Sequence, residues 1–208
     1  CAINSCHMGI TAEEIATRYH VSRADQDAFA AQSQQRASRA LKDGTFTAEI
    51  VPVDVPQKKG APLRVASDEH PRPDTTAEKL SALKPAFKKD GSVTAGNASG
   101  INDGAAAVVV TTAARAMALG RQPVATILSF ASAGVDPAIM GMGPVPAVRK
   151  ALGRLNLDIA QIDLFEVNEA FAVQTVAVMR ELGLRAEQVN TRGGAISLGH
   201  PIGASGTR

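Results

Sequence analysis

The stretch LFEVNEAFAVQTVAVMREL, residues 164–182, is the most regular part of the sequence and decides the fold class. Its first residues, Leu164–Val167, form a short apolar run typical of a buried strand. From Glu169 to Leu182 the apolar residues recur at helical spacing, and the expected apolar face consists of Ala172, Val173, Val176, Ala177 and Met179. The stretch therefore predicts a strand that passes directly into an amphipathic helix, the building unit of α/β proteins.

Apolar runs and helical segments also alternate upstream of this stretch. Residues 105–110 and 124–130 are apolar runs that we expect to be strands, and residues 112–119 between them are expected to be a helix. A further helix is expected over residues 146–155, followed by a turn at residues 158–161. This alternation predicts an α/β protein whose sheet is covered on both faces.

The first hundred residues are less regular. Thr11 and Glu14 have the spacing of a capping box, which predicts a helix start, and a second helix is expected from Ser22 to the stop at Gly44. Residues 50–55 alternate like a short strand. Residues 56–80 are rich in proline and charge, which favours an irregular surface loop of the kind that holds ligands.

Composition and charge exclude several classes of protein. The 22 basic and 20 acidic side chains give a net charge of +2, which offers no basis for binding nucleic acid or a membrane surface. No signal-peptide core and no apolar run of about 20 residues is present, so we expect neither secretion nor a membrane span. The two cysteines, Cys1 and Cys6, are too close in sequence for a disulfide bond between them to stabilise a fold. This favours a reducing, cytoplasmic setting. The sequence does not begin with methionine, so we expect it to be truncated.

Asn168 and Glu169 lie where the expected strand becomes a helix. The carboxyl ends of strands in open α/β sheets are where ligands bind. Two interpretations of Asn168 remain open: its side chain caps the following helix, or its amide binds a substrate or a catalytic water.

His200 lies in the glycine-rich segment GHPIGASG, residues 199–206, where neighbouring glycines allow close approach of a ligand or of another part of the backbone. It is either a general base or hydrogen-bond donor, or an ordinary turn residue. The segment matches neither the dinucleotide fingerprint nor a P-loop, so no nucleotide cofactor is expected. The four histidines have no spacing that predicts a metal site, and His20 and His70 are expected to be surface residues.

Six strings together resemble the thiolase family, in the family's order and over essentially the whole chain. They are HMGITAEEIA at 7–16, DEHPRPDTT at 68–76, TAGNASGINDGAAA at 94–107, GVDPAIMGMGPVPA at 134–147, EVNEAFA at 166–172 and GGAISLGHPIGASG at 193–206. The last two strings are highly specific. Within the family the likeness is closest to the biosynthetic acetyl-CoA acetyltransferases of bacteria.

The resemblance implies a thiolase-like fold, in which two mixed-sheet α/β core units carry a lid or loop domain. On that map residues 1–101 are the rear part of the lid, residues 102–122 end the N-terminal core unit, and residues 123–208 begin the C-terminal core unit. The fold is expected to be incomplete at both ends. Family members are usually dimers or tetramers, so a homo-oligomer is expected by resemblance.

The resemblance also implies the reaction and its central residues. Thiolases carry out a Claisen condensation of two acetyl-CoA molecules to acetoacetyl-CoA and CoA, or the reverse thiolysis, through an acyl-cysteine intermediate. Asn168 and His200 would form the oxyanion hole, in which the asparagine holds a water and the histidine binds the thioester oxygen. The coenzyme A thioester is the substrate, and no cofactor or metal is implied.

The implied coenzyme A and acyl pocket contains side chains from several strings. Arg72 would meet phosphate or adenine, Ser99 would hydrogen-bond the pantetheine, and apolar side chains would form the wall. The residues that the resemblance assigns to this pocket are His7, Met8, Arg72, Phe87, Ala95, Ser99, Met140, Ala170 and Phe171.

Both of the family's cysteine motifs are missing from the sequence. Neither the helix-start nucleophile nor the C-x-G-G-G segment occurs, and Cys6 is not at a family position. We therefore expect this chain alone to be inactive and the complete protein to be an acetyl-CoA C-acetyltransferase of fatty acid metabolism. The alternatives are a degradative 3-ketoacyl-CoA thiolase and a non-catalytic thiolase-like protein that binds acyl-CoA. A nicotinamide-binding domain ranks last because the glycine fingerprint is absent.

Overall fold

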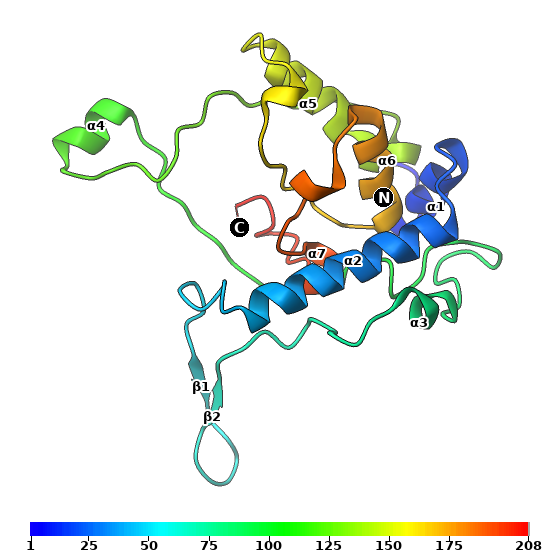
Figure 1. The fold of residues 1–208 in the computed structure, drawn as a ribbon, viewed down its shortest axis with the longest axis horizontal. Coiled ribbons are helices and arrows are strands. Elements are labelled where there is room, and N and C mark those ends of the chain that lie inside the picture. Colours follow the sequence, from blue (N-terminus) through cyan, green and yellow to red (C-terminus); the bar gives the residue numbers. More distant parts are fainter. Residues whose placement is uncertain (208) are drawn as a thin grey trace.

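The computed structural model describes residues 1–207, in which helices pack around two cores and a hairpin and a long loop project outward (Figure 1). The α-helices are α1 (Met8–Arg18), α2 (Arg23–Lys42), α3 (Ala77–Ser81), α4 (Ala113–Ala118), α5 (Pro144–Gly153), α6 (Ala172–Leu182) and α7 (Ala195–Leu198). Short 3-10 helices are η1 (Pro137–Met142), η2 (Ile159–Gln161) and η3 (Ala186–Gln188), and the strands are β1 (Val53–Val55) and β2 (Leu63–Val65).

Helix α6 forms the centre of the larger core. Its apolar face packs against α1, η1 and α5. The expected Val173 and Ala177 are buried in this core and Val176 is partly buried, but Val178 is also buried and the expected Met179 is only half-buried. The fully buried members of this core include Ile15, Val93, Val173 and Val178, each no more than 1% exposed. Burial of these side chains is the main favourable term that holds α1, η1, α5 and α6 together.

Helix α6 begins three residues later than the sequence indicates. We expected it to start at Glu169, but its first residue is Ala172, because the preceding segment is held extended by a neighbouring loop. The Ala172 N–H donates to the Asn97 carbonyl at 2.8 Å, and Phe171 bridges Ala98. The helix ends at Gly183, whose φ of +66° is accessible to glycine at low cost.

The capping box expected at the start of α1 is wrong. The helix begins at Met8, and the His7 side chain accepts the Gly9 N–H at 3.0 Å. Thr11 therefore lies inside the helix and donates its hydroxyl proton to the Met8 carbonyl at 2.7 Å. By contrast, the expected start of α2 is confirmed, because Ser22 and Asp25 form a reciprocal capping box.

The expected strands of the core sheet do not form ladders within residues 1–207. Residues 105–110 and 124–130 are extended and exposed, with Val109 95% and Val124 104% exposed, and they lead to and from the projecting α4 (Figure 1). Leu164–Val167 is reduced to one parallel bridge between Phe165 and Val189. A strand is stable only beside a partner, and the described residues supply none for these runs.

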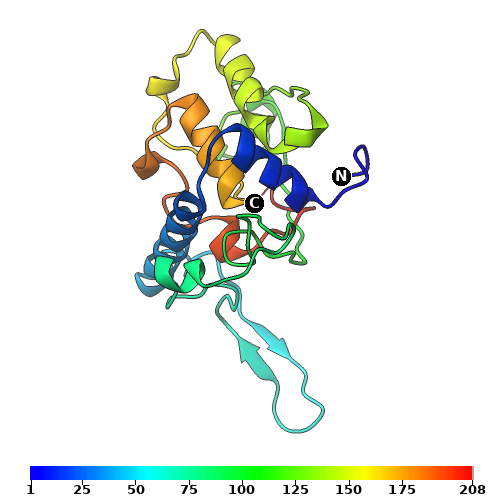
Figure 2. The same cartoon turned by 90° about the vertical axis from the view of Figure 1, so that its right-hand side faces the viewer.

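The region between α2 and α3 contains a two-stranded hairpin. Strands β1 and β2 pair antiparallel in the register Val53 to Val65, and the hairpin projects from the body in both views (Figures 1 and 2). The expected strand at 50–55 is thus confirmed in its second half. The rest of residues 56–80 is irregular up to α3, as the proline content predicts.

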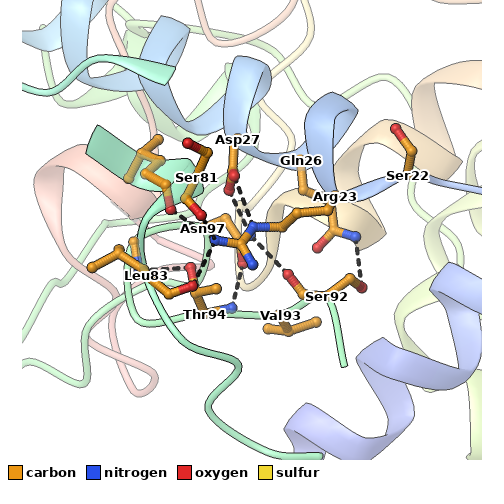
Figure 3. Close-up of polar contacts among 12 residues, drawn as sticks. Ser22, Arg23, Gln26, Asp27, Ser81, Leu83, Ser92, Val93, Thr94 and Asn97 are labelled. Carbon is orange, nitrogen blue, oxygen red and sulfur yellow. Dashed lines mark hydrogen bonds and ion pairs between the residues drawn. The ribbon is translucent and has the colours of Figure 1, made fainter. Parts of the chain in front are cut away.

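A polar network joins α2 to the loop that precedes the site (Figure 3). Arg23 pairs with Asp27 at 2.7 Å and also donates to the carbonyls of Leu80 and Leu83. On the other side of Asp27, the Asn97 amide donates to its carboxylate at 2.9 Å. The ion pair and the hydrogen bonds thus replace the water that Arg23 and Asp27 lose on burial. A buried charge needs such partners.

Asn97 orders the loop that contains it. Its side-chain oxygen accepts the Thr94 N–H at 2.8 Å, and its side-chain nitrogen donates to Asp27 and to the Ser92 carbonyl. Asn97 and Thr94 are both 0% exposed. These bonds, together with the bond that the Ala172 N–H donates to the Asn97 carbonyl, fix the loop against the start of α6.

Asn97→Ala is expected to lower the free energy of unfolding by roughly 2–4 kcal/mol, because buried groups at Thr94 and Asp27 lose a partner. Chemical denaturation of the variant and the parent protein measures the difference. The matched control is Asn4→Ala, since Asn4 is exposed. Equal stability of the two variants would contradict the role assigned to Asn97.

Candidate active site

Asn168 and His200 meet at the surface. The Asn168 side-chain nitrogen and the His200 Nε2 are 3.4 Å apart, although the residues are 32 positions apart in sequence. Asn168 lies on the extended segment before α6, and His200 follows α7. The two side chains that the sequence singles out for an oxyanion site therefore face a common spot.

The segment before α6 and the segment after α7 are each held in place by the same loop. The His200 N–H donates to the Asn102 side-chain oxygen at 3.0 Å and to the Gly100 carbonyl at 3.3 Å. The Ser99 N–H donates to the Ala170 carbonyl at 3.0 Å. Loop residues 97–102 thus align both sides of the pair.

The alternative that Asn168 caps a helix does not hold. Helix α6 begins at Ala172, its N-cap is Phe171, and no side chain caps it. Asn168 lies four residues before the helix and directs its amide to His200.

The Ser205 hydroxyl contacts the ring nitrogen of His200 that faces away from Asn168. The His200 Nδ1 and the Ser205 hydroxyl oxygen are 2.7 Å apart, and that hydroxyl donates to the Pro201 carbonyl at 3.1 Å. A hydroxyl has one proton to donate. With that proton on the Pro201 carbonyl, the Ser205 oxygen accepts from Nδ1–H, and the Nε2 lone pair faces the Asn168 amide. Neutral His200 can therefore take up a proton at Nε2.

A buried carboxylate lies directly beside Asn168. Glu169 is 1% exposed and accepts three hydrogen bonds, from the Ser33 hydroxyl at 2.6 Å, the Asn190 amide at 2.8 Å and the Ile196 N–H at 3.1 Å. Burial raises the pKa of Glu169 above its usual range, and the hydrogen bonds from Ser33, Asn190 and Ile196 oppose that shift. The sequence places Glu169 at the junction but does not indicate this role.

Asn190 and Gly194 complete the buried network. Asn190 accepts the Val167 N–H and donates to the Val167 carbonyl, both at 2.7 Å, so its side chain imitates a strand partner. A Cβ at Gly194 would lie 2.3 to 2.7 Å from the carboxylate atoms of Glu169. Only glycine lets the backbone pass this close to the carboxylate.

An apolar pocket of about 260 Å³ opens next to Asn168. Four of the predicted substrate-contacting residues line it: Met8, Met140, Ala170 and Phe171. Its other walls come from α1, η1, α5, α6 and the extended segment before α6, through Thr11, Ala12, Ile15, Gly141, Pro144, Val167 and Gln174. A pocket with an apolar wall and one polar end is the usual form of a small-molecule site.

Two more predicted residues support the pocket wall from outside. The His7 ring stacks on Phe87 at 4.6 Å between centroids, and Phe87 meets Phe171 edge-on at 6.0 Å. Such aromatic pairs add to the stability that burial provides. His7 and Phe87 therefore hold Phe171 in position and do not line the pocket.

The remaining predicted residues lie farther from the pocket. The Ser99 hydroxyl donates to the Ala170 carbonyl at 3.0 Å, and Ala95 is exposed. Arg72 is exposed, and its backbone N–H donates to the Gln34 side chain at 2.7 Å. None of these three lines the 260 Å³ pocket.

Asn168 also borders a second, larger cavity of about 910 Å³. Its lining is mixed in charge and includes Glu166, Arg192 and the glycine-rich segment that begins at Gly193. Asn168 therefore lies between an apolar pocket on one side and a polar opening on the other.

The partial burial of His70 was not predicted from the sequence. We expected it on the surface, but it is half-buried, with its Nδ1 3.0 Å from the Ser197 carbonyl. A Cβ at Gly100 would lie 2.5 Å from the His70 ring. His70 thus packs between the two segments that flank His200.

Within residues 1–207, no cluster of His, Cys, Asp or Glu could hold a metal ion, and no helix is long and apolar enough to cross a bilayer.

Comparison with known proteins gives consistent matches over the whole chain. The model of the thiolase N-terminal domain matches residues 1–114, and that of the thiolase C-terminal domain matches residues 121–208. The chain is 62% identical over 205 residues to a probable acetyl-CoA acyltransferase of Staphylococcus epidermidis, covering 99% of the chain and 52% of that protein. It is 61% identical over 207 residues to an acetyl-CoA acetyltransferase of Pseudomonas aeruginosa, covering 100% and 53%. The chain spans about half the length of the curated relatives it matches.

Solved structures agree with the sequence matches. The crystal structure of the acetyl-CoA acetyltransferase of Bacillus anthracis superposes with a TM-score of 0.91 at 48% identity, covering 97% of this chain and 51% of that one. Human mitochondrial 3-ketoacyl-CoA thiolase gives a TM-score of 0.89 at 48% identity, covering 96% and 50%. The expected α/β fold class is thereby confirmed.

Gly194→Ala is expected to destabilise the protein by roughly 1–3 kcal/mol, because the added methyl group overlaps the Glu169 carboxylate. Thermal and chemical unfolding measure the loss. Gly203→Ala is the matched control, since a Cβ at Gly203 has nothing within 4 Å. If both variants unfold like the parent protein, the Glu169 network is not tightly packed at Gly194.

Proposed function

The chain belongs to the thiolase family, and from this premise we propose that it supplies the oxyanion-binding side of an acetyl-CoA acetyltransferase active site. The observation that carries the proposal is the approach of Asn168 and His200 to 3.4 Å, with Asn168 lining an apolar pocket. The acyl group of a coenzyme A thioester would occupy this pocket, with its carbonyl oxygen toward the pair. Cytoplasmic location, self-association and the absence of any cofactor belong to the same proposal.

The chemistry requires a group that first accepts and then donates a proton. A cysteine thiol becomes nucleophilic when a base removes its proton. In the neutral tautomer that directs Nδ1–H to Ser205, His200 has its Nε2 lone pair on the side of Asn168. Nε2 would take the thiol proton, and the resulting Nε2–H would donate to the thioester oxygen.

Negative charge then develops on that oxygen when the carbon beside the carbonyl loses its proton. Fixed donors stabilise such charge because they need no rearrangement as it forms. The Asn168 amide, alone or through a water molecule, would be the second donor. Its position follows from Glu169, which is anchored by three hydrogen bonds on the buried side.

The similarity to solved structures also supports a second candidate function, that of a degradative 3-ketoacyl-CoA thiolase. Human mitochondrial 3-ketoacyl-CoA thiolase is similar to this chain at 48% identity, the same value as the Bacillus anthracis acetyltransferase. Thiolysis of longer 3-ketoacyl-CoA esters would use the same two donors. Relative turnover of acetoacetyl-CoA and a long-chain 3-ketoacyl-CoA by the full-length protein distinguishes the two candidates. A thiolase-like protein that only binds acyl-CoA would turn over neither.

His200→Asn and Asn168→Ala in the full-length protein are each expected to lower kcat for acetoacetyl-CoA thiolysis by about 10²–10³-fold, the usual effect of losing an oxyanion donor. Acetyl-CoA binding measured by calorimetry is expected to change little. His20→Asn is the control, because His20 is exposed and has a φ of +51° that asparagine tolerates. Full turnover by either site variant would refute the assignment.

The 208-residue chain purified alone is expected to show no thiolysis of acetoacetyl-CoA, because neither Cys1 nor Cys6 lines the pocket at Asn168. Loss of the substrate's enolate absorbance measures turnover, with the full-length protein as the positive control. Clear turnover by the chain alone would show that the nucleophile lies within these 208 residues.

A further inference from the structure

Gln174 is a polar side chain in the wall of the apolar pocket beside Asn168. It lies in the first turn of α6 and lines the pocket of about 260 Å³. Gln174 is 5% exposed, and its side-chain oxygen is buried without a hydrogen-bond partner within residues 1–207. The proposed reaction uses this side chain in no step.

The other polar side chains of the pocket wall direct their donors elsewhere. Of the described residues that line the pocket, Thr11, Asn168 and Gln174 have polar side chains. The Thr11 hydroxyl donates its one proton to the Met8 carbonyl at 2.7 Å, so it cannot also donate to Gln174. The Asn168 amide is directed to His200. The Gln174 oxygen therefore receives no donor from the wall in which it lies.

The stem of Gln174 is packed too tightly for the amide to turn away from the pocket. A Cβ at Gly141 would lie 2.6 Å from the Gln174 Cγ and 3.0 Å from the Ile15 Cδ1. The backbone of η1 and the Ile15 side chain of α1 thus confine the glutamine from two sides. A closely packed side chain moves only if its neighbours also move. The amide therefore keeps its place in the pocket wall.

An amide in this position discriminates between short and long acyl groups. A pocket of about 260 Å³ has room for an acetyl group together with water, since a water molecule takes up about 30 Å³ of the liquid. Water beside the acetyl group hydrates the polar part of the wall. A long alkyl chain displaces this water and offers no hydrogen bond in return, which weakens binding.

We propose that Gln174 is a specificity-determining residue that restricts the pocket to short acyl groups. The inference rests on the proposed function, because it requires that the acyl part of a coenzyme A thioester occupies this pocket. It goes further than the proposed function in choosing between the two candidates. An unpaired amide in the wall favours acetyl and acetoacetyl groups over the alkyl chains of longer 3-ketoacyl esters.

Gln174→Met in the full-length protein that contains residues 1–208 tests the proposal, because methionine is a similarly long, unbranched side chain without the amide. Calorimetry measures the binding of two unreactive thioethers, S-ethyl-CoA and S-octyl-CoA. We expect the variant to bind S-octyl-CoA about 10-fold more tightly than the parent protein does, the usual effect of removing a buried polar group that lacks a partner. Its affinity for S-ethyl-CoA is expected to change little.

Turnover by the same proteins gives a second measurement of chain-length preference. The ratio of kcat/KM for 3-ketooctanoyl-CoA to kcat/KM for acetoacetyl-CoA is expected to rise by about the same factor in Gln174→Met. Gln174→Leu is expected to change both measurements in the same direction, so the result does not depend on the packing of one side chain. Gln35→Met is the matched control, because Gln35 is exposed on α2. It is expected to alter neither the binding ratio nor the turnover ratio.

The possible failures of the proposal are distinguishable. Unchanged long-to-short ratios in Gln174 variants that still bind S-ethyl-CoA would overturn this inference and leave the proposed function standing. A parent protein that binds neither thioether would overturn both. Urea unfolding is a further check, because removing an unpaired amide is expected not to lower the unfolding midpoint. A lower midpoint for Gln174→Met would show that the amide has a partner in the full-length protein, and would also overturn the inference.

Discussion

The buried carboxylate of Glu169 is the interaction on which the candidate site depends. A carboxylate removed from water is costly unless hydrogen bonds replace its hydration, and here three donors do so. These donors come from α2, from the turn at Asn190 and from the start of α7, so the carboxylate ties three separate segments together. Because Asn168 is the preceding residue, the position of its amide is determined by how tightly Glu169 is held.

Helix α2 provides the framework against which these segments are fixed. Its buried side is largely polar and small, and includes Asp27, Ser33 and Gln34. Asp27 binds the loop of Asn97, Ser33 binds Glu169, and Gln34 binds the Ile196 carbonyl at 3.3 Å. Arg36 adds a bond to the Val189 carbonyl at 2.6 Å. A helix that buries hydrogen-bonding groups at helical spacing can align loops that have no secondary structure of their own, which an apolar helix face cannot do.

The sequence predicted those parts of the structure that local interactions determine. The helix start at Ser22 and the helix at residues 112–119 are set by neighbouring residues, and both were predicted. The runs at 105–110 and 124–130 were not correctly predicted, because a strand depends on a partner elsewhere in the chain. The approach of Asn168 to His200 followed from the family motifs. The burial of Glu169 and His70 did not, because it depends on contacts with residues far away in sequence, such as Ser33 and Ser197.

The extended backbone at residues 168–169 explains how one short segment both anchors the site and presents it. In an extended chain successive side chains point to opposite sides. Glu169 points inward and is 1% exposed, whereas Asn168 is exposed beside the pocket. A helix beginning at Glu169 would have turned the two side chains only about 100° apart, and the amide would no longer oppose the anchored carboxylate. The start of α6 is delayed to Ala172 by the hydrogen bond to the Asn97 carbonyl, and this delay therefore allows the rigid, buried Glu169 to hold the exposed Asn168 amide in place.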